Sequence, residues 1–143
     1  MTRSKKRAQA GLLICGLVLI SFTLIFFSRG GAETYINDTF RKAASASLFG
    51  AGYLIYFSMI LRTRQTPCDE RDEAVSTRAG LSALTVVLVY TYILSISLYE
   101  IYRNAGSLPV SWMWFIGYSN SFVGPVAHSI STLILHRGAG NDV

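Results

Sequence analysis

Residues 11–27 read GLLICGLVLISFTLIFF, and no Asp, Glu, Lys or Arg interrupts them. The uncharged stretch extends over residues 8–28, and three more follow at residues 43–61, 79–99 and 104–135. A helix needs about 20 residues to cross the roughly 30 Å hydrocarbon core of a bilayer. Each stretch is close to that length or exceeds it, so the sequence predicts four membrane-spanning helices.

The composition supports this interpretation. Of the 143 residues, 51% are hydrophobic and 15% are charged, whereas an ordinary soluble domain has about 25% charged residues. Backbone groups in lipid need internal partners, which only helices and closed β-barrels supply, and these runs lack the alternation of barrel strands. We therefore predict an all-α fold, one integral membrane domain that forms a four-helix bundle. Its spans are expected at about residues 8–27, 43–61, 79–102 and 110–135.

The basic residues predict the orientation of the helices. Nine of the thirteen fall in the N-terminal segment, the loop after the second span and the C-terminal tail: Arg3, Lys5, Lys6, Arg7, Arg62, Arg64, Arg71, Arg78 and Arg137. The other four fall in the remaining two loops: Arg29, Arg41, Lys42 and Arg103. Cytoplasmic loops carry an excess of Lys and Arg. We expect an inner (plasma) membrane protein with both termini cytoplasmic. This placement accounts for the net charge of +5 without a nucleic-acid partner.

The segment TPCDERDEAVSTR, residues 66–78, separates the second and third spans. Thr66 fits the N-cap of a helix and Pro67 its first position. Four of the eight carboxylates of the protein then fall in the first two turns, where the helix dipole favours negative charge: Asp69, Glu70, Asp72 and Glu73. The pattern predicts that the third helix begins in the cytosol near Pro67 and enters the membrane near Ala79.

Asp69, Glu70 and Arg71 form a DER segment that leads into a hydrophobic helix, with paired hydrophobic stretches on each side. This arrangement resembles the pattern of certain uncharacterised small prokaryotic membrane proteins. The resemblance implies a four-helix membrane protein and no particular activity.

Two polar stripes recur at spacings of four and three residues. In the third span the stripe is Leu81, Thr85, Leu88, Tyr92, Ser95, Tyr99 and Tyr102, and in the fourth it is Gly117, Ser121, Gly124, His128, Ser131 and Leu135. Small residues allow close approach and serines bond across helices, so we expect the stripes to pack against each other. Pro125 removes a helical hydrogen bond. The neighbouring segment GYSNSFVGP is therefore expected to kink or unwind, with a ligand or water pocket as the alternative to simple bending.

His128 is an ionisable group inside the fourth span, and such residues are costly in lipid and often functional. We take it as the centre of a candidate polar site with Ser121, Asn120, Tyr92 and Ser95. The alternatives are a structural imidazole bonded to Tyr or Ser, a proton or ligand site, and a metal or haem ligand. His136 lies about two turns further along the same helix, too far to complete a compact metal site. We expect no metal and no cofactor.

A second candidate site lies at the outer ends of the third and fourth spans and comprises Glu100, Tyr99, Trp112 and Trp114. Glu100 is expected to pair with Arg103, three residues later. The aromatic rings are typical of the belt at a membrane interface. An outer polar site is the alternative.

The sequence contains no nucleotide-binding loop, paired cysteines or catalytic triad pattern, so we expect no catalytic residues. Gly50, Gly117 and Gly124 are expected to allow close helix contacts, within the bundle or with another protein. The sequence favours a non-enzymatic accessory, assembly or regulatory subunit that contacts another membrane protein or its own copies. The alternative is a small oligomeric proton-coupled transporter or ligand-binding protein that uses the stripe on the fourth helix.

Overall fold

The computed structural model describes residues 3–63 and 70–138. Its elements are α1 (Arg3–Phe27), the 3-10 turn η1 (Ser28–Gly30), α2 (Gly31–Tyr35), α3 (Thr39–Thr63), α4 (Glu70–Tyr102) and α5 (Ser111–Gly138). The all-α prediction is confirmed for these residues. The predicted cap residues Thr66, Pro67 and Asp69 lie outside them.

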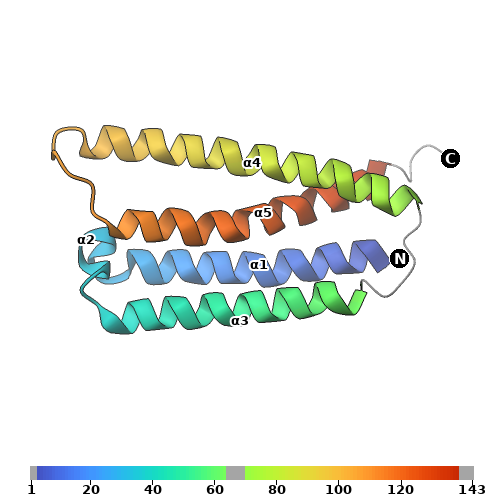
Figure 1. The fold of residues 1–143 in the computed structure, drawn as a ribbon, viewed down its shortest axis with the longest axis horizontal. Coiled ribbons are helices and arrows are strands. Elements are labelled where there is room, and N and C mark those ends of the chain that lie inside the picture. The colour runs from blue at the N-terminus through green and yellow to red at the C-terminus, as the bar shows by residue number, and fades with distance from the viewer. Residues whose placement is uncertain (1–2, 64–69, 139–143) are drawn as a thin grey trace.

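The four long helices of the described ranges lie side by side in the order α3, α1, α5, α4 (Figure 1). Each helix runs antiparallel to its neighbour, so α1 begins and α5 ends at the same end of the molecule. The central helices α1 and α5 pack on each other, while α3 packs on α1 and α4 packs on α5. In the described part of the chain α3 and α4 share no extended contact. In the described residues the helices form a layer with α3 and α4 at its edges, so the bundle that the sequence predicted is not confirmed.

The core lies between α1 and α5, near the end that carries α2. Phe26 is fully buried there, with ring centroids 4.7 Å from Phe115, 4.9 Å from Tyr35 and 5.4 Å from Trp112. A smaller buried cluster toward the other end consists of Cys15, Val18 and Phe122. Aromatic residues that bury large areas thus join the two central helices along much of their length.

The connection from α1 to α3 is organised around Arg41, which is 4% exposed. Asp38 caps α3, because its carboxylate accepts from the backbone N–H of Arg41 at 3.1 Å and from its Nε at 2.9 Å. The guanidinium also donates to Thr34 Oγ1 at 2.7 Å and to the carbonyls of Phe26 and Ser28. One buried side chain therefore links the end of α1, α2 and the start of α3.

Three helices are long and apolar enough to cross a membrane: Ser4–Phe27, Thr39–Leu61 and Glu70–Tyr102. These segments confirm the first three predicted spans as membrane-crossing candidates. Helix α5 does not meet the same criterion, because serines, Asn120 and His128 lower its hydropathy. It lies between α1 and α4, where fewer of its side chains would face lipid. Pro125 lies inside α5 without interrupting it, so the unwound segment that the sequence allowed is not present.

Candidate functional site

The packed face of α4 differs from the stripe that the sequence indicated. The residues of that stripe are largely exposed: Leu81, Thr85, Leu88, Tyr92, Ser95 and Tyr99, with Tyr92 68% exposed. Helix α4 instead buries Ala79, Ala83 and Leu98, with Thr91 half-buried between them. The small alanine side chains let α4 approach α5 closely, which the bulky residues of the stripe would prevent. The expectation that the two polar stripes pack together is therefore wrong for α4.

Side-chain hydrogen bonds join α4 to α5. Thr91 Oγ1 donates to Asn120 Oδ1 at 3.0 Å, and Ser131 Oγ donates to Ser82 Oγ at 2.9 Å. Gly124 lies in the same seam, where a Cβ at its position would be 3.6 Å from a methyl group of Val87. Gly124 thus faces α4 as expected, and polar side chains of the two helices bond across this seam.

The five residues of the predicted polar site do not converge. Tyr92 and Ser95 are exposed on α4, and Ser95 Oγ donates to its own helix, to the Thr91 carbonyl at 2.7 Å. Asn120 is in the α4–α5 seam, and Ser121 Oγ donates to the Gly117 carbonyl at 2.9 Å. Their helical faces point in different directions, and a spacing rule applied to each helix separately could not reveal this.

His128 is half-buried near the middle of α5. Its carbonyl accepts from Thr132 Oγ1 at 2.8 Å. Within residues 3–63 and 70–138, its imidazole has no hydrogen-bond partner. The described chain therefore does not show the hydrogen bond to Tyr or Ser that a structural role predicted. The same ranges contain no group of three or more His, Cys, Asp or Glu residues able to hold a metal ion.

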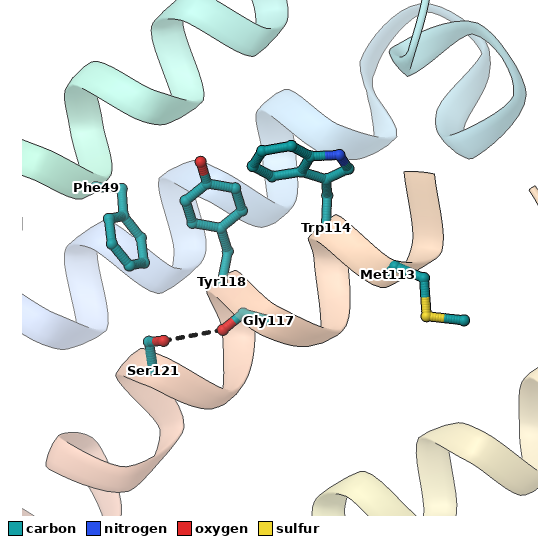
Figure 2. Close-up of a pocket in the computed structure, with 6 residues that line it drawn as sticks. All are labelled: Phe49, Met113, Trp114, Gly117, Tyr118 and Ser121. Carbon is teal, nitrogen blue, oxygen red and sulfur yellow. Dashed lines mark hydrogen bonds between the residues drawn. The ribbon is translucent and has the colours of Figure 1, made fainter. Parts of the chain in front are cut away.

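An open aromatic groove of about 450 Å³ lies on the N-terminal half of α5. Its lining residues are Phe49 of α3 and Met113, Trp114, Gly117, Tyr118 and Ser121 of α5 (Figure 2). Trp114 stacks on Tyr118 with ring centroids 5.5 Å apart, and Phe49 meets Tyr118 edge-on at 4.5 Å. A Cβ at Gly117 would meet no atom within 4 Å. Gly117 therefore widens this groove and does not form the expected helix contact.

The outer candidate site divides into a buried and an exposed part. Trp112 is buried in the core and donates its indole N–H to Tyr102 Oη at 3.1 Å, so it is not a simple belt residue. Trp114 is exposed, as a belt residue would be. Arg103 donates to Glu100 at 3.2 Å, which is the pair expected from their spacing. Tyr99 lines a second groove beside this pair.

The opposite end of the layer holds a contact that the sequence did not indicate. His136 Nε2 lies 3.0 Å from Ser4 Oγ and 3.7 Å from a carboxylate oxygen of Asp72. This arrangement brings together the start of α1, the start of α4 and the end of α5. Asp72 therefore contacts α5, a neighbouring helix of the layer. Glu70 and Glu73 are exposed, as expected for a solvated helix end.

The glycine of α3 that packs within the described chain is Gly52 and not Gly50, for which the sequence allowed a contact either within the bundle or with another protein. A Cβ at Gly50 would meet nothing within 4 Å, whereas one at Gly52 would lie 2.8 Å from a methyl group of Val18. The available signal was the helical spacing of Ser45, Leu48, Gly52 and Tyr56, which together form the packed face of α3.

No family model, curated protein or solved structure matches the chain. The class that the fold itself defines is an all-helical protein, in whose described residues three helices are suited to crossing a membrane. The resemblance to small prokaryotic membrane proteins stays a prediction.

Proposed function

We propose that this chain is a four-span inner-membrane protein, with both termini cytoplasmic, that binds another membrane protein as an accessory, assembly or regulatory subunit. Its action is helix–helix contact and not catalysis. The partner packs along the edge of the layer formed by α3.

The observation that carries this proposal is the unpacked small-residue face of α3. Ala46, Ser47 and Ala51 are exposed, and the space above Gly50 is open. Association of helices in lipid depends on close packing of small residues, because lipid and protein interiors are similarly apolar. From the sequence, these small residues could form contacts within the bundle or with another protein. Because they are absent from contacts within the described chain, contact with another protein is favoured.

Photo-crosslinking in native membranes tests the proposal. A photoreactive residue at Leu54, which is 75% exposed one turn beyond Gly50, should crosslink to a distinct protein. The matched control is Leu17, an exposed residue on α1, which should crosslink mainly to lipid. Gly50→Leu should abolish the protein crosslink from Leu54 without reducing folded yield, because its side chain enters open space. Lipid adducts alone at Leu54 would contradict the proposal, and adducts only between copies would favour a homo-oligomer.

His128 keeps the transporter as a second candidate, because an ionisable side chain inside a proposed span is often functional, and its half-buried imidazole has no hydrogen-bond partner in the described chain. His128→Gln retains a polar group but removes the ionisable imidazole. If the chain is a partner-binding subunit, this variant should keep both the Leu54 crosslink and the cellular phenotype. Loss of the phenotype at full yield with the crosslink retained would favour proton-coupled transport.

A further inference from the structure

A groove of about 470 Å³ follows the last two turns of α4 and opens beside the loop that leads to α5. Its apolar side chains are Leu98, Leu108, Met113 and Ile116, and its polar or aromatic ones are Ser95, Tyr99, Tyr102, Arg103 and Ser107. From Ser95 to Arg103 the helix rises about 12 Å. The groove therefore runs from the apolar part of the predicted span to its charged end.

Arg103 lines the mouth of the groove, and Glu100, which lies outside the lining, contacts Arg103. Arg103 and Glu100 form an exposed pair at 3.2 Å, and their side chains are 56% and 57% exposed. In the described chain this is the one ion pair of Arg103, and a guanidinium has five N–H donors, so further donors remain for an anion. The end of α4 and the start of α5 meet here, and their opposed dipoles largely offset each other. The charges of Arg103 and Glu100 therefore dominate the electrostatic potential at the mouth of the groove.

We infer that this groove binds a zwitterionic glycerophospholipid whose headgroup ends in a primary amine. The phosphate accepts hydrogen bonds from Arg103, the ammonium group pairs with Glu100, and an acyl chain lies along Leu98 and Ile116. The argument is charge complementarity, because a headgroup with adjacent negative and positive groups matches a rim with adjacent positive and negative side chains. It requires that α4 and α5 lie in a bilayer and is independent of the protein partner proposed above.

The headgroup preference is testable by native mass spectrometry of the detergent-solubilised full-length protein, titrated with phosphatidylethanolamine or phosphatidylglycerol of identical acyl chains. The wild-type protein should bind phosphatidylethanolamine more tightly. Arg103→Gln should weaken both lipids, by about tenfold for the loss of a charged hydrogen bond. Glu100→Gln should weaken phosphatidylethanolamine but strengthen phosphatidylglycerol, because it removes the group that attracts an amine and repels an anionic headgroup. Equal binding of both lipids to wild type, or equal effects of Glu100→Gln on both, would overturn the inference.

The location is tested by filling the groove. Ser95 lines the groove, whereas Ser97 is exposed on α4 and does not line it. In the described structure the hydroxyl of each serine bonds only to the backbone of its own helix. Ser95→Trp should reduce binding of both lipids severalfold, and Ser97→Trp should not. Thermal unfolding of each lipid-free variant establishes that folding is intact. Equal effects of the two substitutions would place the lipid elsewhere, and binding of glycerophosphoethanolamine, which has no acyl chains, as tight as that of the lipid would also overturn the inference.

Discussion

Arg41 is one of the four basic residues that the charge count assigns to the outer side, yet it is buried in the structure. A buried charge is costly unless it is paired and hydrogen-bonded. Asp38, Thr34 and two backbone carbonyls supply those partners. The ring of Tyr35 adds a cation–π contact, with the guanidinium carbon 5.6 Å from its centroid. The fold of the loop therefore accounts for Arg41. When Arg41 is set aside, the excess of basic residues on the predicted cytoplasmic side becomes larger.

Asp38 makes the stability of this loop depend on pH. The N–H of Arg41, and then its guanidinium, hold the pKa of the Asp38 carboxyl below its ordinary value of 3.8. A carboxyl with a lower pKa in the folded state stabilises the fold above its unfolded pKa, and this contribution is lost as pH falls through the folded value. Thermal unfolding in detergent should show constant stability above about pH 5 and a decrease below about pH 4.

Asp38→Asn should lower stability at neutral pH and flatten this acid dependence, because Asn still caps a helix but does not ionise. Lys42→Gln, a change of one exposed charge beside Arg41, is the control and should keep the wild-type pH profile. An unchanged acid transition in Asp38→Asn would assign the dependence to other carboxylates.

Small residues lie at close contacts of three of the long helices. Helix α3 uses Gly52 against Val18, α4 uses Ala79 and Ala83, and α1 uses Gly11 against Ser129 of α5. Such residues permit close approach and leave the remaining circumference of α3 and α4 exposed. The two outer helices lie on opposite sides of the central pair and share no extended contact in the described residues.

The two glycines of α3 should respond differently to one added methyl group. Gly52→Ala places a Cβ 2.8 Å from Val18 and should destabilise the fold by about 1–3 kcal/mol through overpacking. Gly50→Ala enters open space and should be neutral, or stabilising by about 0.5–1 kcal/mol, because Ala favours the helix. Denaturant unfolding of both variants in the same detergent provides the comparison. Equal destabilisation would show that both faces of α3 pack in the isolated protein.

At the scale of the whole molecule, the antiparallel order of the helices places the start of α1 and the end of α5 together. At 33 residues α4 is about 50 Å long, which exceeds the bilayer core and leaves room for its acidic first turns outside it. A start of α1 and an end of α5 at the same end of the molecule are consistent with the proposed orientation, in which both termini are cytoplasmic.

Reporter fusions should establish the orientation and the number of spans. Fusions after Arg64 and Val143 should report the cytoplasm, and a fusion after Asn104 should report the outside, because four crossings return the chain to its starting side. A shared side for Asn104 and Val143 would mean that α5 does not cross the membrane. A cytoplasmic signal at Asn104 with an external signal at Arg64 would instead show that the orientation in the membrane is the reverse of the proposed one.

The sequence by itself determined the features that depend on local composition. The apolar runs predicted the helical class and four membrane-spanning helices, of which three are suited to crossing a membrane in the described residues, and the spacing of Glu100 and Arg103 predicted their ion pair. Hydropathy reports the average of a segment, and pairing within a helix depends only on its own geometry. Neither inference needed to know which helices are neighbours.

Only the tertiary structure decided which faces pack. It selected Ala79 and Ala83 over the stripe that contains Tyr92, Gly52 over Gly50, and the meeting of Asp72 with His136. In a soluble helix the apolar face identifies the buried side, but a membrane helix is apolar toward both lipid and protein. The choice of face then depends on the shapes of side chains on neighbouring helices, which a single sequence does not display.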